Sequence, residues 1–207
     1  MGELIILADR LRDRVPRVGL ARPAFFFDLA CPFSYLAAER IERVLGDVEW
    51  IPVSAATLAV GVRRSAPTAD GVAVLRAEAE RRALELRLPL VWPERFPADF
   101  PHALRAAVHA ADIGAGARFA LAAGRLAFCG GYDLEDADTL AEPAAAAGIA
   151  PDPCLLAAAD PGRDELLCAT AGALRVRGVR ALPVIRLGGR FIDAEAGLVS
   201  APLAPPA

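Results

Sequence analysis

The feature that most constrains the fold is a junction between a strand and a helix at residues 24–46. Residues 24–28 form a short, apolar and aromatic run, which is typical of a buried strand. After a brief turn, apolar residues recur at helical spacing over about 33–46. Pro32 suits the first turn of that helix, because the N–H that proline lacks would have no partner there. The sequence therefore places Cys31 at the amino end of the first helix.

Cys31 is the first candidate for chemistry. Unpaired N–H groups and the helix dipole favour a negative charge at a helix amino end. A thiol in that position tends to have a lowered pKa and a larger thiolate fraction. The alternative is a buried, inert cysteine that packs as a small hydrophobic residue. The agreement of strand, proline and helix phase favours a functional thiol, so the sequence predicts a pKa of Cys31 below about 8.5.

The rest of the chain alternates between helices and a few strands. A second strand at 48–53 completes a βαβ unit. Patterns of helical spacing then cover about 71–87, 102–113, 116–130, 136–148, 152–159 and 163–177. Two short strands, 184–187 and 190–192, flank Gly188-Gly189, a strong signal for a two-residue hairpin, and a short helix follows. The order is β-α-β, a helical block, and then α-β-β-α.

The junction resembles the first βα unit of the thioredoxin superfamily. The stretch Asp28-Leu29-Ala30-Cys31-Pro32-Phe33-Ser34-Tyr35-Leu36 is similar to the Asp-x-x-Ser-Pro-x-x-Tyr/Trp-Leu pattern of 2-hydroxychromene-2-carboxylate isomerases and kappa-class glutathione transferases. That branch of the superfamily also holds the DsbA-like oxidoreductases. Cys31 takes the place of the serine, and Ser34 stands where dithiol oxidoreductases carry their second cysteine.

The resemblance extends over about residues 23–200. It implies an α/β architecture, a thioredoxin-like fold with a helical insertion between the βαβ and ββα halves. On this basis we expect a thioredoxin-like domain formed by 21–54 and 162–200, and a helical insertion domain at 55–161. Residues 1–20 would be an N-terminal arm and 201–207 a flexible tail.

Three further residues are predicted to bind a cofactor. In the superfamily, a residue followed by a cis-proline precedes the third strand, faces the first helix and offers backbone groups to a bound thiol compound. Leu182 and Pro183 take this place, although a trans proline at the start of an edge strand is the ordinary alternative. Glu195 falls where relatives carry the acid that binds the γ-glutamyl amine of glutathione. An acid near a helix amino end also has a plain electrostatic explanation.

His102 completes the predicted catalytic residues, with Cys31 and Ser34. It falls on the asparagine of the isomerase Pro-Asn-x-Leu loop and could act as an acid or base near pH 7. The alternative is a residue at the start of a solvated helix. Arg95 and Arg105 could bind an anionic substrate, although surface arginines are common in a chain with 23 basic residues.

Bulk properties exclude several classes of function. A net charge of -3 gives no reason to expect nucleic-acid binding, and no segment approaches the ~20 apolar residues of a membrane span. The cysteines have no C-x-x-C spacing, and with two histidines they form no zinc pattern. We therefore predict no metal, reduced thiols and a cytoplasmic protein.

The leading hypothesis is a glutathione- or thiol-dependent enzyme that resembles 2-hydroxychromene-2-carboxylate isomerase, with Cys31 at the active-site serine position. Its cofactor would be glutathione or another low-molecular-weight thiol, and its substrate a small aromatic-derived acid. One alternative is a monothiol DsbA-like thiol-disulfide oxidoreductase, and the other is a non-catalytic thioredoxin-fold binding protein. No nucleic-acid or membrane partner is expected, and a homodimer is left open.

Overall fold

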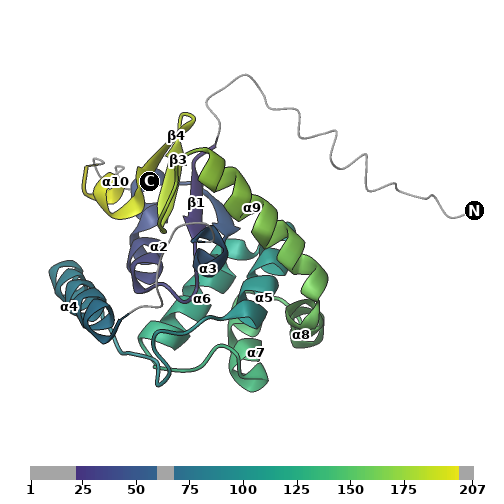
Figure 1. Ribbon diagram of the computed structural model, residues 1–207. Helices are drawn as coiled ribbons and strands as arrows, with labels where there is room; N and C mark the ends of the chain where they lie inside the picture. Colours follow the sequence, from purple (N-terminus) through teal and green to yellow (C-terminus); the bar gives the residue numbers. More distant parts are fainter. Residues whose placement is uncertain (1–21, 60–67, 201–207) are drawn as a thin grey trace, which may run out of the picture.

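The computed structural model describes residues 22–59 and 68–200 (Figure 1). One four-stranded sheet has the order β2-β1-β3-β4, formed by β1 (Ala24–Phe27), β2 (Glu49–Pro52), β3 (Val184–Leu187) and β4 (Arg190–Asp193). β2 runs parallel to β1, whereas β3 pairs antiparallel with both β1 and β4. Segments from the two ends of the described chain therefore meet in the same sheet.

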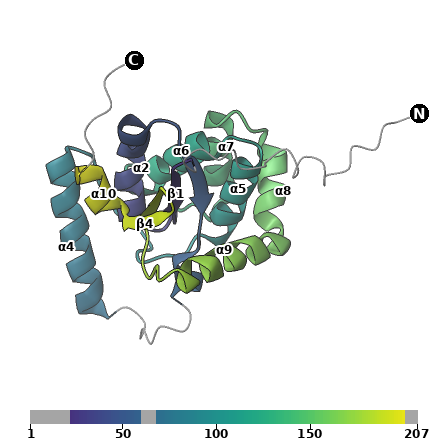
Figure 2. The same ribbon diagram turned by 90° about the horizontal axis from the view of Figure 1, so that it is seen from above.

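Helices cover both faces of the sheet and fill the middle of the chain. They are α2 (Pro32–Leu45), α3 (Ala55–Leu58), α4 (Ala69–Leu86), α5 (Pro101–Asp112), α6 (Gly116–Phe128), α7 (Ala137–Ala146), α8 (Pro151–Ala159), the 3-10 helix η1 (Pro161–Arg163), α9 (Asp164–Val176) and α10 (Ala194–Ser200). Helices α5 to α8 group together, whereas α4 stands apart at the opposite edge in both views (Figures 1 and 2). Within the described residues, no helix is long and apolar enough to cross a membrane.

β1 lies at the centre of the molecule because both of its faces are apolar. Alternate strand residues point to opposite faces. Phe25 and Phe27 join the larger core, where the Trp50 ring meets the Phe25 ring edge-on at 5.1 Å between centroids. Phe26 points to the other face, into a smaller core with Leu174. A strand of this kind fixes the sheet, and its carboxyl end then fixes the position of Cys31.

The elements expected from the sequence are present, each within two residues of its expected ends. The hairpin is also confirmed, since Gly188 and Gly189 both adopt positive φ, 53° and 83°, which glycine reaches without strain. The four-residue helix α3 was not expected from the sequence, because it is too short to show a period. The expected arm, 1–20, and tail, 201–207, lie outside the described residues, and the domain division stays a prediction.

Candidate functional site

Cys31 stands at the amino end of α2, at the carboxyl end of the central strand. It is the residue immediately before the helix, with extended backbone angles, and Pro32 occupies the first helical turn. The Cys31 carbonyl accepts hydrogen bonds from the amides of Ser34 (3.0 Å) and Tyr35 (3.2 Å), which begin the helix. The expected position of the thiol at a helix amino end is therefore the observed one.

The thiol faces a proline segment that lies far away in the sequence. Cys31 Sγ is 3.8 Å from the carbonyl oxygen of Leu182 and donates to it, and the Leu182–Pro183 peptide is cis. The Pro183 carbonyl in turn accepts from the Ala194 amide at 3.1 Å, which holds the start of α10 beside the proline. The structure thus brings together Cys31, Leu182 and Pro183. Glu195 directly follows Ala194, the residue that donates to the Pro183 carbonyl.

The pKa prediction for Cys31 is wrong. Burial raises the pKa of the Cys31 thiol to about 11, although the residue keeps part of its surface open to solvent. Hydrogen bonds from Ser34 lower this pKa, and the charge of Asp28 raises it further. The environment therefore favours a protonated thiol at neutral pH, because desolvation of the thiolate outweighs the hydrogen bonds at the helix amino end.

Ser34 and Asp28 brace the turn that carries Cys31. Both side chains are buried, and the Ser34 hydroxyl accepts from the Asp28 amide at 3.2 Å. The Asp28 carboxylate accepts from the amides of Ala30 (2.8 Å) and Ala55 (2.6 Å), so it joins the turn to the start of α3. Burial raises the pKa of Asp28 to about 6, against the effect of these two hydrogen bonds. The predicted catalytic residue Ser34 therefore lies beside the thiol.

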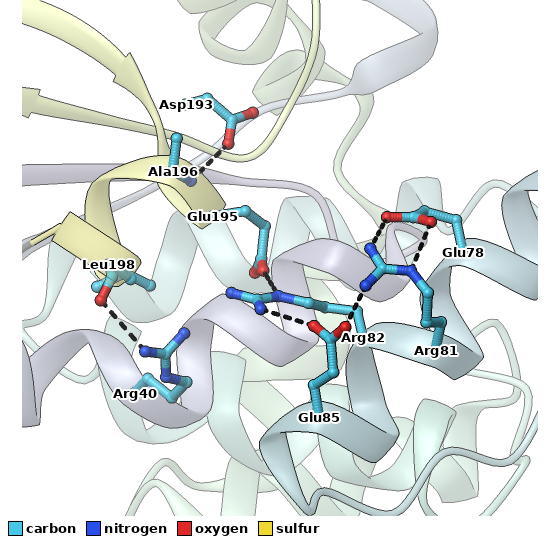
Figure 3. Close-up of polar contacts among 9 residues, drawn as sticks. All are labelled: Arg40, Glu78, Arg81, Arg82, Glu85, Asp193, Glu195, Ala196 and Leu198. Atoms are coloured by element: carbon cyan, nitrogen blue, oxygen red, sulfur yellow. Dashed lines mark hydrogen bonds and ion pairs between the residues drawn. The ribbon is translucent and has the colours of Figure 1, made fainter.

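Glu195 is already engaged within the protein. Its carboxylate forms an ion pair with Nε of Arg82, which α4 supplies from 113 residues away (Figure 3). Arg40 of α2 lies nearby and donates to the Leu198 carbonyl at 3.2 Å. The sequence contained no signal for this cluster, since its members are common surface residue types on three separate helices. Binding of a ligand amine by Glu195 stays a prediction, and it would have to compete with Arg82.

The structure does not bring His102 into contact with Cys31. Nδ1 of His102 is 2.6 Å from a carboxylate oxygen of Glu135, and half of the His102 side chain is exposed. The other Glu135 oxygen accepts from the amides of His102 (3.0 Å) and Ala103 (3.4 Å). Glu135 therefore caps α5 and holds the imidazole, so the observed contacts favour a structural role for His102.

The two arginines considered for an anionic substrate are also paired with acids. Arg105 makes two parallel hydrogen bonds of 2.8 Å to the carboxylate of Asp164. Arg95 forms an ion pair with Asp133. Neither guanidinium is left without an acid, so neither supports an anion site as the molecule stands.

A pocket of about 300 Å³ lies between α3, α5 and α9. Its apolar wall includes Phe100, Leu104 and Leu167, and its polar wall includes Asp99 and Cys168. Cys31 and His102 do not line it. Among the described residues of its lining there is no basic side chain, so these residues offer no partner for the carboxylate of an acidic substrate.

Comparison with known families agrees with this architecture. Residues 24–199 match the family described as the DSBA-like thioredoxin domain. The chain belongs to this family. No curated protein resembles the sequence closely enough to count as a match.

Solved structures show the same fold at low sequence identity. A 2-hydroxychromene-2-carboxylate isomerase superposes with a TM-score of 0.74 at 17% identity, covering 86% of this chain and 91% of the other. The cytosolic disulfide reductase DsbM from Pseudomonas aeruginosa, solved with GSH, has a TM-score of 0.63 at 17% identity, covering 86% of this chain and 93% of the other. The expected thioredoxin-like α/β fold with a helical insertion is thereby confirmed.

Proposed function

We propose that the protein is a thiol-dependent enzyme in which Cys31 acts as a hydrogen-bond donor to the sulfur of a bound low-molecular-weight thiol. Glutathione is the first candidate for that thiol. The observation that carries the proposal is the geometry of Cys31, a lone thiol at a helix amino end that points at the carbonyl of the residue before a cis-proline. The raised pKa agrees with a thiol that keeps its proton.

The mechanism assigns a separate task to each part of the site. The amino end of α2 stabilises the negative charge of the bound thiolate. The Cys31 thiol turns its proton from the Leu182 carbonyl to the bound sulfur, and the backbone of Leu182 aligns the ligand. The thiolate adds to an unsaturated, aromatic-derived acid, a bond rotates, and elimination regenerates the thiolate. Because every electron pair returns to its origin, the reaction is an isomerisation that consumes no reductant.

The comparisons support this proposal by analogy. One similar structure is that of an isomerase of this kind, and another was solved with GSH. Free cysteines at all four positions also suit a reducing, cytoplasmic setting. The substrate class rests on the resemblance of the sequence alone.

A monothiol oxidoreductase is the second candidate, and one observation favours it. Cys31 is partly exposed, so a disulfide substrate could reach it. Ser34 carries a hydroxyl and no sulfur, so it cannot form the new disulfide bond that would resolve a mixed disulfide, and an external thiol would have to do so. This reaction needs a thiolate at Cys31, which the buried environment disfavours.

Two substitutions at one position separate these candidates. We would measure isomerisation of a hydroxychromene carboxylate with glutathione, and reduction of a glutathione mixed disulfide, in Cys31→Ser and Cys31→Ala. If Cys31 only donates a hydrogen bond, Cys31→Ser keeps isomerisation within about tenfold and Cys31→Ala loses about 100-fold or more. Cys168→Ser is the control, because Cys168 lines the separate pocket.

The contrary results are equally clear. Equal loss of isomerisation in both Cys31 variants would overturn the donor role and indicate a nucleophile. Mixed-disulfide reduction alone, abolished in Cys31→Ser, would establish the oxidoreductase. Inactivity in both assays, with no glutathione bound at millimolar concentration, would leave a binding protein on a thioredoxin scaffold.

A further inference from the structure

Helix α4 has 18 residues but buries very little of itself. Its buried residues are Ala79 and Ala83, whose side chains are single methyl groups. Among its larger apolar side chains, Leu84 is 80% and Val74 70% exposed, whereas Leu86 is partly buried and packs against the core at the end of the helix. Most helices in proteins are stabilised by the packing of a broad apolar face, whereas the apolar contact of α4 is limited to Ala79, Ala83 and the partly buried Leu86.

Charged side chains make the contacts that hold α4. Arg82 pairs with Glu195 of α10 and, at 3.1 Å, with Glu85 of α4 itself (Figure 3). The side chains of Arg82 and Glu195 are only 16% and 20% exposed, so this is the most sheltered ion pair on the helix. Arg81 binds Glu78 and Glu85, and these contacts stay within α4. Arg82 therefore makes the ion pair that joins α4 to α10.

The other attachment of α4 also uses charged groups. The guanidinium of Arg76 lies 5.1 Å from the Trp92 ring centre and 5.3 Å from that of Phe96. Glu80 accepts from the Trp92 indole at 2.7 Å. Ion pairs and cation–π contacts at partly exposed sites are weak compared with the burial of large apolar groups. Dissolved salt also screens exposed ion pairs.

We propose that α4 is a helix fastened by charge, which can separate from the folded body as a unit, with the Arg82–Glu195 ion pair as its fastening. The contact lies close to the thiol centre along a short chain of bonds. Glu195 directly follows Ala194, whose amide donates to the Pro183 carbonyl. The residue before Pro183 is Leu182, and its carbonyl accepts a hydrogen bond from the Cys31 thiol. Release of α4 therefore frees the Glu195 carboxylate beside that centre. This inference holds whichever reaction Cys31 performs.

Hydrogen exchange of backbone amides, read by mass spectrometry, tests the fastening. Arg82→Glu should raise exchange over 69–86 about tenfold or more, while exchange over 116–128 in α6 stays unchanged. The matched control is Arg81→Glu. It places the same new charge one residue away, and it also removes a contact with Glu85, but Arg81 makes no ion pair outside α4 among the described residues. It should change exchange over 69–86 less than about threefold.

Charge exchange gives the decisive comparison. Glu195→Arg alone should release α4 as Arg82→Glu does, and the double variant Arg82→Glu with Glu195→Arg should bring exchange back to within about threefold of the original protein. Raising NaCl from 0.05 M to about 1 M should increase exchange over 69–86 selectively but by less than Arg82→Glu does, because salt screens the sheltered Arg82–Glu195 pair less than an exposed one. Equal effects of Arg82→Glu and Arg81→Glu, no recovery in the double variant, or a parallel rise in α4 and α6 would each overturn the proposal.

Discussion

Helices α4 and α6 both pack against α2, yet different interactions hold them. α6 buries Phe119 and Phe128 completely, together with several alanines. α4 buries two alanines, packs the partly buried Leu86 against the core, and otherwise relies on arginine and glutamate side chains. In Figure 1, α6 lies inside the helical group while α4 stands at the edge of the molecule.

The difference shows that a well-formed helix is not necessarily a firmly attached one. Burial of a large apolar side chain contributes roughly 1.5–3 kcal/mol, and a buried methyl group about 0.8 kcal/mol. An exposed ion pair adds only about 0–1 kcal/mol and depends on salt. α6 should therefore open only when the whole domain unfolds, whereas α4 can open alone.

The largest expected effect is that of Phe119→Ala in α6. Because Phe119 is fully buried, its loss should lower the free energy of unfolding by about 3–5 kcal/mol, as measured by urea denaturation. The matched change on α4 is Leu84→Ala, which should stay within about 0.5 kcal/mol because Leu84 is exposed. Similar losses in the two variants would contradict the contrast between the helices.

Local sequence patterns were enough to predict most of the fold. A few neighbouring residues are enough to identify each of three features: the strand before the turn at Cys31, the proline that follows Cys31, and the Gly188-Gly189 turn. The position of Cys31 against Leu182-Pro183 followed from the resemblance of two short motifs, one in each half of the chain. The sequence therefore predicts contacts between neighbouring residues, and contacts between motifs whose arrangement is known from a family.

The electrostatic environments of Cys31, His102 and Glu195 could not be predicted, because distant parts of the chain create them. The position of Cys31 at the amino end of α2 suggested a lowered pKa. Cys31 is buried, however, in part by distant residues such as Leu182, and this burial raises its pKa instead. His102 and Glu195 could be placed on helices, yet their partners, Glu135 and Arg82, come from other elements. A pKa depends on every group that surrounds an atom, and the sequence does not reveal that set.

Asp28 sharpens the comparison, because it is a charge held inside the apolar body rather than at its edge. Burial raises its pKa from 3.8 to about 6, so the native state holds the proton more tightly than the unfolded state does. The stability that protonated Asp28 contributes is therefore present below about pH 4 and lost as the pH rises through 6. Replacement by asparagine removes this titration.

The measurement is the difference in unfolding free energy between the original protein and Asp28→Asn, taken from about pH 3.5 to 7.5. As the pH rises, we expect the unfolding free energy of the original protein to fall by about 2–3 kcal/mol relative to that of Asp28→Asn. Other acids titrate in both proteins and largely cancel. A difference that is constant with pH, or that changes in the opposite direction, would mean that burial does not raise the pKa of the Asp28 carboxyl.

The smallest expected effect comes from an ion pair on α6 itself. Arg125 of α6 makes two hydrogen bonds, 2.6 and 2.7 Å, to the Glu39 carboxylate of α2. Glu39→Gln removes the charge and keeps a hydrogen-bond acceptor, so it should cost less than about 1 kcal/mol of stability. Exchange over 116–128 should not change, because Phe119 and Phe128 still hold α6. The same substitution at the α4 contact, Glu195→Gln, should raise exchange over 69–86. If Glu39→Gln loosened α6 as much as Glu195→Gln loosens α4, charge rather than burial would govern both helices.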